Sequence, residues 1–582
     1  MRRFAVMVGI ALFAAAAVRS QHATDRVLDH GVATTATIVT QPRLAIDGRE
    51  RYATWSAFQP TQVGVFFNVS RDDGATWPLA EVQLDDGVSH GLDPQIAVVG
   101  DRVYVVWHED ARGIRVNVSV DRGRTWLPMS RRLSSPSATP SSVVLTASES
   151  IVFVAWRDTR NSAGQPASAD VYCNYSTDDA TTWLGSDVRL NSGTAGAQIV
   201  FSPFATAKGQ TVFVAWSDTR NGLADVFFNR TADAGATWLP ADVRLDTDAI
   251  GSSQSLLNSI AATDSHSVFA AWVDERGGSS DVYVNRSLDG GMTWLGADVR
   301  VDSNHPGSGG SVNPRVATEA GSVYVVWHER VRQGEIRANV SSDLGATWLM
   351  ADIRVSDPTA ELLVGAWPQL VASDSGVLVA WPDVRSSSPG LYGNYSGDFG
   401  VTWRGADVKL NRSAGGGLSN FSDSLNLAAF ENQFAMVWFD GTVVSYNVPF
   451  GHLATGTGSP GTLGVPTQEL LGVPTLGNSI DVIVGSAQPG APGALLIGIG
   501  PATRTSIPLF GGELVVLPNL PGVPFVVSSA SPPLSSGIAS VSLRLPNQPA
   551  FSGLQVNLQS LIIDLGAPLG IAMTNGTVLW IG

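Results

Sequence analysis

The chain has 582 residues, a formal net charge of −15 and one cysteine, Cys173. Its negative charge would repel the phosphate backbone of DNA or RNA, which excludes a nucleic-acid partner. A single cysteine allows neither an intramolecular disulfide nor a metal site built on thiolates. We expect Cys173 to be buried as a small apolar side chain.

Residues 1–20 are typical of a secretory signal peptide. Arg2 and Arg3 precede an apolar stretch, 4–18, and a plausible cleavage site follows Ser20. This stretch is too short to span a membrane, and no later segment of the sequence reaches spanning length. The mature protein is therefore predicted to be soluble and secreted.

An eight-residue motif, S/T-x-D-x-G/A-x-T-W, recurs seven times and is called the octad below. The octads start 49 to 57 residues apart, at Ser70, Ser119, Ser176, Thr231, Ser287, Ser341 and Ser396. A recurrence of this kind indicates an array of similar supersecondary units.

Each octad residue suits a tight hairpin turn. The aspartate can accept backbone N–H groups of its own turn, and the glycine two positions later supplies a positive φ. The third octad has Ala180 in place of this glycine, so its turn is either strained or differently shaped. The seven octad aspartates, for which we predict a structural role, are Asp72, Asp121, Asp178, Asp233, Asp289, Asp343 and Asp398.

An apolar run ending in Trp precedes each octad, and short strand-like segments flank the octad on both sides, as residues 211–245 illustrate. This order predicts an antiparallel meander of strands. Eight such runs occur against seven octads, and 15 of the 17 Trp belong to repeat positions. The last unit lacks its fourth strand, which residues 25–29 (DRVLD) resemble. We predict an eight-bladed β-propeller over residues 25–455, with seven blades as the alternative.

The octads resemble the Asp-box (BNR) repeats of the sialidase superfamily. This resemblance implies a propeller whose octads lie on the face opposite the active site, but it is weak for activity, because Asp boxes also occur in non-enzymatic propellers. Sialidases hold the substrate carboxylate with three arginines and use a Tyr nucleophile assisted by Glu and Asp. Here Pro42 precedes Arg43, the reverse of the family's R-I-P order. No Tyr–Glu pair can be assigned, and Tyr175 and Tyr395 are interpreted as packing residues, so the catalytic residues stay unknown.

After the repeats the composition changes. Residues 456–464 predict a Gly/Pro-rich linker, and 465–582 contain only six charged residues among short apolar runs. This pattern predicts a second all-β domain, similar to a β-sandwich, that serves in attachment or docking.

Candidate ligand-binding residues lie at the start of each innermost strand, which would line the mouth of the central channel. A proline often stands 13 residues before the strand-ending Trp, and the position after it differs between blades. The residues at that position are Arg43, Gln95, Phe204, Arg315, Gln369 and Asn426. Two arginines among polar and aromatic neighbours are compatible with an anionic sugar, although structural roles for them are also open.

Two further groups of residues carry side chains suited to chemistry. Loop residues that could act as a general acid or base if they converged are His90, Asp93, His305 and Glu361. A D-x-R sequence also recurs after the strand-ending Trp, at Asp158/Arg160, Asp218/Arg220, Asp274/Arg276 and Asp383/Arg385. A group repeated in this way favours an Asp–Arg brace for a turn over a rim of free guanidinium groups.

Three functions are compatible with these patterns. The first is a secreted, sialidase-like propeller that recognises extracellular glycans or a surface protein without hydrolysing them. The second is an exo-sialidase with Arg43 and Arg315 in its carboxylate clamp, and the third is a structural surface protein. No cofactor and no metal are predicted, since metal-ligand spacings and phosphate loops are missing from the sequence.

Overall fold

The structure, a computed structural model, describes residues 26–28 and 38–580 with gaps, the longest being 412–424, 456–466, 527–536 and 545–554. Every regular element named in these residues is a β-strand. They include no helix with the length and apolar character that a membrane crossing requires. Residues 1–20, the predicted signal peptide, and the predicted linker 456–464 lie outside the described part of the chain.

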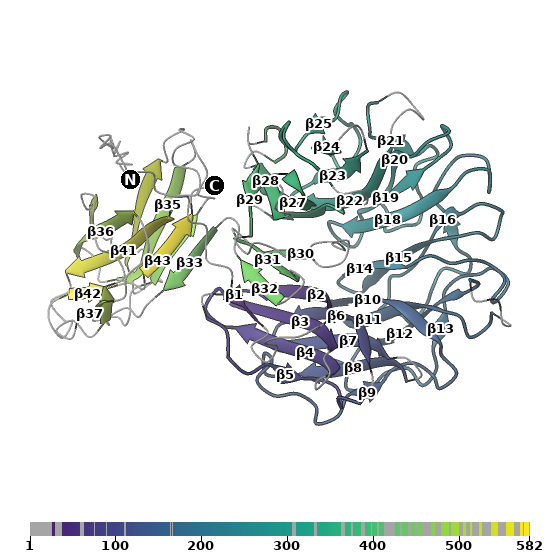
Figure 1. Cartoon of the computed structure of the whole chain (residues 1–582), viewed down its shortest axis with the longest axis horizontal. Coiled ribbons are helices and arrows are strands. Elements are labelled where there is room, and N and C mark those ends of the chain that lie inside the picture. Colours follow the sequence, from purple (N-terminus) through teal and green to yellow (C-terminus); the bar gives the residue numbers. More distant parts are fainter. Residues whose placement is uncertain are drawn as a thin grey trace.

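The repeats form four-stranded antiparallel sheets that follow one another around a ring (Figure 1). Blade 1 contains β2 (Ile38–Asp47), β3 (Glu50–Phe58), β4 (Val63–Ser70) and β5 (Val82–Gln83). Blade 2 contains β6 (Gly91–Val99), β7 (Arg102–Glu109), β8 (Gly113–Ser119) and β9 (Arg131–Arg132). Blade 3 contains β10 (Pro140–Ser148), β11 (Ile151–Asp158), β12 (Asp170–Ser176) and β13 (Val188–Arg189). Blade 4 contains β14 (Phe204–Lys208), β15 (Thr211–Asp218), β16 (Asp225–Thr231) and β17 (Val243–Arg244).

The second half of the ring repeats this arrangement. Blade 5 contains β18 (Ser255–Ala262), β19 (Val268–Asp274), β20 (Asp281–Ser287) and β21 (Val299–Arg300). Blade 6 contains β22 (Ser311–Glu319), β23 (Ser322–Glu329), β24 (Glu335–Ser341) and β25 (Ile353–Arg354). Blade 7 contains β26 (Gln369–Ser373), β27 (Gly376–Asp383), β28 (Gly390–Ser396) and β29 (Val408–Lys409). Blade 8 contains β30 (Leu425–Phe430), β31 (Gln433–Phe439) and β32 (Val444–Asn447), with β1 (Arg26–Val27) as its fourth strand.

The ring closes between the first and last blades. The innermost strand of each blade contacts that of the next, and β30 contacts β2. The N-terminal strand β1 pairs antiparallel with β32, so that Arg26 faces Tyr446. Leu28, which is fully buried, packs in a cluster of residues from blades 1 and 8. The sequence prediction of eight blades, completed by a strand from the N-terminus, is therefore confirmed.

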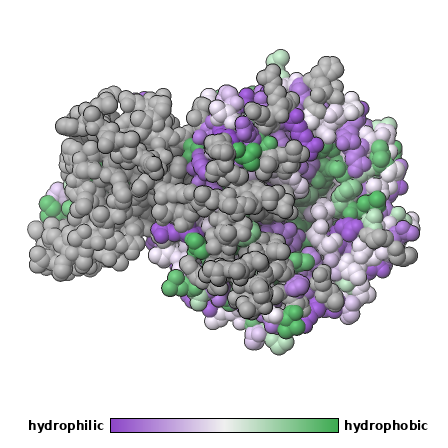
Figure 2. Space-filling model, viewed as in Figure 1, coloured by the Kyte–Doolittle hydropathy of each residue, from purple (hydrophilic) through white to green (hydrophobic). Residues whose placement is uncertain are grey.

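The core lies between the blades and is built around the Trp of each second strand. These eight side chains are fully buried: Trp55, Trp107, Trp156, Trp216, Trp272, Trp327, Trp381 and Trp438. Cys173 is also fully buried, as the sequence predicted, in a cluster of blade 3 and blade 4 residues. On the side of the propeller seen in Figure 2, hydrophilic residues are common at the rim and hydrophobic ones lie in small groups.

Each blade is a meander, so its connections alternate between two faces of the ring. The octads join the third and fourth strands, and the face that carries them is called the octad face. The innermost strands begin on the opposite face, here called the mouth face. The loops between second and third strands also open on the mouth face, because antiparallel neighbours reverse direction at every connection.

The octad aspartate holds its turn through hydrogen bonds. In the third octad, the Ser176 hydroxyl donates to Asp178 Oδ1 over 2.7 Å. Thr182 donates its backbone N–H to Oδ1 and its hydroxyl to Oδ2 of Asp178, over 2.9 and 2.6 Å. The same three bonds form at Asp72, Asp121, Asp233, Asp289 and Asp343. These bonds hold each carboxylate within its own turn, while Asp398 lies outside the described residues.

The third octad keeps the turn shape of the others despite its alanine. Ala180 has a φ of 62°, close to the 76° of Gly123 in the second octad. An alanine in the left-handed region is strained by about 1–2 kcal/mol relative to glycine. Of the two alternatives left open by the sequence, strain rather than a different shape is therefore correct.

We expect the hydrogen bonds of the octads to make the propeller sensitive to acid. Bonds from the following Thr lower the pKa of Asp121, Asp178, Asp233, Asp289 and Asp343 from 3.8 to about 2. Because the folded pKa lies below the unfolded one, this contribution to stability is complete above pH 4 and is lost as the pH falls towards 2. Urea midpoints followed by Trp fluorescence should fall over this range. The variant T182V/T237V removes two donor hydroxyls and should show a smaller fall; an unchanged pH dependence in this variant would contradict the assignment.

The C-terminal segment forms separate sheets. Its larger sheet contains β33 (Gly451–Thr455), β36 (Pro492–Ile499), β39 (Val523–Val526), β41 (Gln555–Ile563), β42 (Ile571–Met573) and β43 (Gly576–Trp580). A second sheet contains β34 (Thr467–Leu471), β35 (Ser479–Ala487) and β40 (Gly537–Arg544), and β37 (Thr505–Ile507) pairs with β38 (Gly512–Leu514). β33 pairs with β43, so this strand belongs to the C-terminal sheets rather than to a blade.

Candidate functional site at the channel mouth

The six candidate ligand-binding residues all lie at or near the start of an innermost strand, on the mouth face, and all are half-buried. Arg43 is on β2, Gln95 on β6 and Phe204 on β14, and the others are Arg315 on β22, Gln369 on β26 and Asn426 on β30. Of these, Asn426 has a structural contact that closes the ring, because its Oδ1 accepts the backbone N–H of Leu44 over 2.9 Å.

Several innermost strands are bulged at this mouth. The pairing register shifts in β2, β6, β10, β18 and β22, each near the start of the strand. Proline lies in three of the bulges and cannot donate a ladder hydrogen bond there. Residues other than glycine adopt a positive φ in four of them: Gln41 (53°), Asp93 (50°), Ser142 (51°) and Asn313 (55°). Polar residues are thereby held at the mouth in a strained backbone conformation.

Blades 1 and 2 contribute one polar group to the mouth. Arg43 places its Nη2 3.5 Å from Asp93 Oδ1, and its Nε donates to Gln95 Oε1 over 3.5 Å. Gln95 in turn donates to Asp93 over 2.9 Å. The contacts of Arg43 are long compared with the usual 2.7–2.9 Å of charge-assisted bonds, so its guanidinium keeps bonding capacity for a ligand.

Blades 5 to 7 contribute a second group. Arg315 donates to the backbone oxygen of Asn258 over 2.7 Å, and its guanidinium carbon lies 5.6 Å from the centre of the Trp367 ring. Trp367 is half-buried and directly precedes Pro368 at the start of blade 7. The repeat pattern did not single out Trp367. It is one of the two Trp outside the repeat positions, and this position was the feature of the sequence that could have marked it as a site residue.

The D-x-R loops on the mouth face are braces. Arg220 lies 2.5 Å from Asp218 of its own loop and 2.6 Å from Asp242 beside the fourth strand, and its guanidinium stacks 3.8 Å from the centre of the Phe227 ring. Equivalent contacts are made by Arg160, Arg276 and Arg385. Since each guanidinium is already paired with two or more carboxylates, the geometry supports the structural interpretation of these loops.

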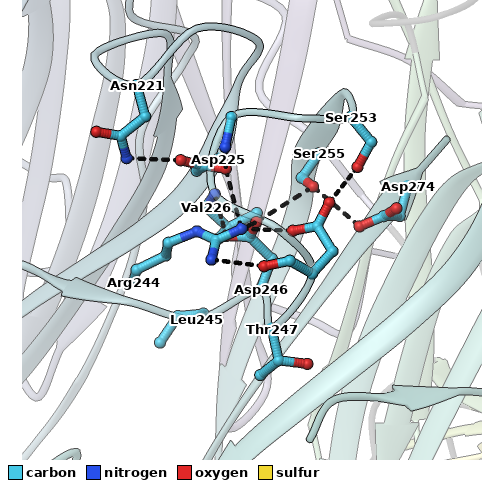
Figure 3. Close-up of polar contacts among 12 residues, drawn as sticks. Asn221, Asp225, Val226, Arg244, Leu245, Asp246, Thr247, Ser253, Ser255 and Asp274 are labelled. Atoms are coloured by element: carbon cyan, nitrogen blue, oxygen red, sulfur yellow. Dashed lines mark hydrogen bonds and ion pairs between the residues drawn. The ribbon is translucent and has the colours of Figure 1, made fainter. Parts of the chain in front are cut away.

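An acidic cluster lies where β16 begins and just after β17 ends, and Figure 3 shows Asp225 and Asp246 around Arg244. The carboxylates of Asp225, Asp246 and Asp248 lie within 4.8 Å of one another. Arg244 Nη2 contacts all three: it lies 3.1 Å from Asp225 and 2.5 Å from Asp246, and it directly contacts Asp248. The guanidinium thus supplies the positive charge that a metal ion would otherwise supply, and the cluster is an ion-pair network.

A similar network occurs in blade 5. In blade 4, where one guanidinium faces three carboxylates, burial raises the pKa of Asp246, and the hydrogen bond between Asp246 and Asp248 raises it further. In blade 5, Arg300 contacts Asp281 and Asp302, while Asn304 replaces the third carboxylate. Burial there raises the pKa of Asp302 to about 6.

A Tyr–Glu pair does occur, but on the octad face. Tyr52 donates its hydroxyl to Glu50 Oε2 over 2.6 Å, next to Arg71 and Arg122, which both bind Glu50. Tyr52 is fully buried, and burial together with the Glu50 carboxylate raises its pKa well above the usual range. This tyrosine therefore stays neutral and inaccessible at ordinary pH, in contrast to a sialidase nucleophile.

The weaker acid–base candidates that the structure describes do not assemble into one group. Asp93 joins Arg43 at the mouth, whereas His90 is exposed. The backbone N–H of Glu361 donates to the buried Asp383 over 3.2 Å, which places Glu361 beside the blade 7 brace. His305 lies outside the described residues.

Comparisons with known proteins assign neither a family nor a function to this chain. No model of a protein family and no curated protein matches the chain. Among solved structures, the chain is similar to a PL25 ulvan lyase (TM-score 0.42, 12% identity, 65% of this chain and 96% of that chain). It is also similar to the lectin BP39L from Burkholderia pseudomallei (0.41, 13%, 63% and 98%) and to the Hadza microbial sialidase Hz136 (0.35, 13%, 74% and 98%). At such identities and TM-scores these proteins do not indicate what this chain binds.

Proposed function

We propose that the mouth of the propeller binds a glycan carrying a carboxylate, without cleaving it, and that the protein acts outside the cell. The observation that carries this proposal is the set of strained bulges at the mouth. A residue other than glycine held in the left-handed region costs on the order of 1–3 kcal/mol, and such strain clusters at functional sites. Four residues of this kind, Gln41, Asp93, Ser142 and Asn313, occur at the same depth in four innermost strands.

The chemistry of the mouth suits an anionic sugar. Arg43 makes only 3.5 Å contacts with Asp93 and Gln95 in this structure, so a ligand carboxylate could take over its guanidinium. Gln95 and Asp93 offer further hydrogen bonds for hydroxyl groups. The half-buried Trp367 offers an apolar ring face, which is the usual complement to a few placed polar groups in a ligand site.

Binding without hydrolysis is favoured over an exo-sialidase by the position of the Tyr–Glu pair. Tyr52 and Glu50 lie on the octad face and are buried there. Glycoside hydrolysis ordinarily needs two acidic groups or a Tyr nucleophile with its base at the scissile bond. At the mouth, Asp93 is the one acidic candidate that the described residues place beside Arg43.

The variant R43A/R315A tests this proposal. We expect the mature wild-type chain to bind carboxylated glycans on an array and the double variant to bind them at least about tenfold more weakly, because a charge-assisted contact is lost. The control R124A removes an exposed octad-face arginine and should bind as the wild type does. A fluorogenic sialoside added to the same proteins should release no fluorophore.

Two results would contradict the proposal in different ways. Fluorophore release that is lost in R43A/R315A would establish the exo-sialidase alternative at the same site. Glycan binding that is unchanged in R43A/R315A would place the ligand elsewhere on the protein.

A further inference from the structure

Blades 2 and 6 each place two arginines opposite one another at the outer edge of the sheet. Arg115 faces Arg132 across β8 and β9, and Arg337 faces Arg354 across β24 and β25. In blades 1, 3, 4, 5 and 7 a Phe or Tyr stands at the corresponding position of the third strand. Like charges directly opposite on neighbouring strands are destabilising, so each arginine pair requires a counter-charge.

In blade 6, two carboxylates neutralise the pair. Glu335 contacts both guanidinium groups, at 2.9 Å from Arg337 and 3.2 Å from Arg354. Asp352 lies 2.6 Å from Arg337. Glu335 therefore bridges the two arginines, and Asp352 binds one of them from the other side.

Blade 2 has no carboxylate at either of these positions. Gly113 pairs with Glu109 in blade 2 as Glu335 pairs with Glu329 in blade 6, so Gly113 stands in place of Glu335. Ser130 stands in place of Asp352, because each lies two residues before the arginine of the fourth strand. Both acidic groups of blade 6 are thus replaced by uncharged residues.

The two guanidinium groups of blade 2 are bonded to uncharged oxygens. Arg115 donates to the backbone oxygen and the hydroxyl of Ser130 over 2.7 and 2.9 Å. Arg132 donates to the backbone oxygens of Ser134 and Ser135 over 3.0 and 2.9 Å. Within the part of the chain that the structure describes, neither arginine forms an ion pair with a carboxylate.

Asp86 of the neighbouring blade does not supply the missing counter-charge. A hydrogen bond from Arg112, over 2.6 Å, is the main cause that lowers the pKa of Asp86, and the charge of Arg115 contributes less. The positive edge of blade 2 therefore persists in a chain of net charge −15. At physiological ionic strength, charges more than about 8 Å away are largely screened, so the local charges decide what binds at this edge.

We propose that the outer edge of blade 2 binds an acidic segment of a partner polypeptide, whose carboxylates take the places that Glu335 and Asp352 occupy in blade 6. One carboxylate would bridge Arg115 and Arg132, since guanidinium groups match carboxylates with two hydrogen bonds each. A polypeptide is favoured over a free dicarboxylate because side chains of a polypeptide fill the corresponding positions in blade 6. Arg131 and Arg132 are also exposed on the outermost strand, where an extended segment can lie alongside.

The variant S130D tests the proposal, because it supplies from within the chain the carboxylate that Asp352 supplies in blade 6. A hexaglutamate peptide is titrated by calorimetry into the mature wild-type chain and the variants at low ionic strength. We expect S130D to bind the peptide at least about tenfold more weakly than the wild type, because a charge-assisted contact is lost. R115Q/R132Q removes both positive charges and should have the same effect. S186D adds the same charge at an exposed position of blade 3 and should bind as the wild type does.

Further measurements separate this site from misfolding, from the mouth and from small anions. The urea midpoint of S130D should be no lower than that of the wild type, because its new carboxylate lies beside Arg115. R43A/R315A alters the mouth alone and should bind the peptide normally. Succinate should bind the wild type at least about tenfold more weakly than hexaglutamate does.

Several results would overturn the proposal. These are a wild type that does not bind hexaglutamate, binding that S130D and R115Q/R132Q leave unchanged, and a loss of binding confined to R43A/R315A. Succinate that binds as tightly as the peptide would also overturn it, because the ligand would then be a small dicarboxylate.

Discussion

Replacing Asp218 with alanine is expected to destabilise the propeller by about 3 kcal/mol, the lower end of the cost of breaking a buried ion pair. Asp218 is fully buried and accepts the indole N–H of Trp216 over 3.0 Å as well as the guanidinium of Arg220. Its removal leaves Trp216 without this acceptor and leaves Arg220 with Asp242 as its one remaining carboxylate in the described residues. The lower end is expected because Asp242 still compensates part of the charge. The measurement is the shift of the urea midpoint followed by Trp fluorescence.

The matched control is an exposed Asp–Arg pair of similar length. Asp179 lies 2.8 Å from Arg102, and both side chains are at least a third exposed. Solvent screening limits such a pair to about 0–1 kcal/mol, so D179N, which keeps a residue type that tolerates the positive φ of this position, should change the midpoint little. If D218A and D179N were equally harmless, the D-x-R loops would not be structural braces, and a ligand role for their arginines would reopen.

Replacing Gly235 with alanine is expected to cost about 2–5 kcal/mol, the sum of left-handed strain and overpacking. Gly235 has a φ of 93°, and an added Cβ would lie 2.4 Å from the ring of Tyr175. The third octad carries alanine at the same position and faces Val118 instead of a tyrosine. The large Tyr175 is thus paired with glycine in the next octad, and the smaller Val118 is paired with alanine.

A double-mutant cycle separates the two contributions to this cost. Y175V/G235A reproduces the junction between blades 2 and 3, so we expect it to recover the overpacking part and to leave the strain part. The reverse change, A180G, relieves strain but removes a buried methyl group, and should shift stability by less than about 1 kcal/mol. Urea midpoints of the wild type, Y175V, G235A and the double variant give the coupling energy. A cost of G235A that is the same in the Y175V background as in the wild type would show that packing between these residues is unimportant.

The fold was predictable from the sequence because the same local pattern recurs in successive blades. A local rule, such as an octad aspartate followed by Thr and Trp, acts within eight residues and depends on no distant contact. The borrowed strand was predictable for the same reason, since residues 25–29 resemble the segment that follows an octad. Ala180 shows where local reasoning stopped: whether its turn was strained or reshaped was decided only by its φ of 62° in the folded chain.

The site was predictable only in part. Counting from the repeat Trp located Arg43, Gln95 and Arg315 on innermost strands at the mouth face, because position in a meander follows from order along the chain. It did not reveal that Asp93 joins Arg43 and Gln95, because this contact depends on a bulge and on the packing of two blades. Trp367 was missed because reasoning from the repeat passes over residues that do not belong to it.

The sequence by itself determined the propeller, its eight blades, the closing strand and the role of the octads, because these follow from local turn chemistry and periodic burial. Tertiary structure alone decided which charged groups are engaged and which are available. Arg220 and Arg43 are alike as residues in a sequence, yet one is held between two buried carboxylates at 2.5–2.6 Å and the other makes 3.5 Å contacts at the mouth. The physical reason is that an ion pair depends on distance and burial, and both are set by how neighbouring blades pack.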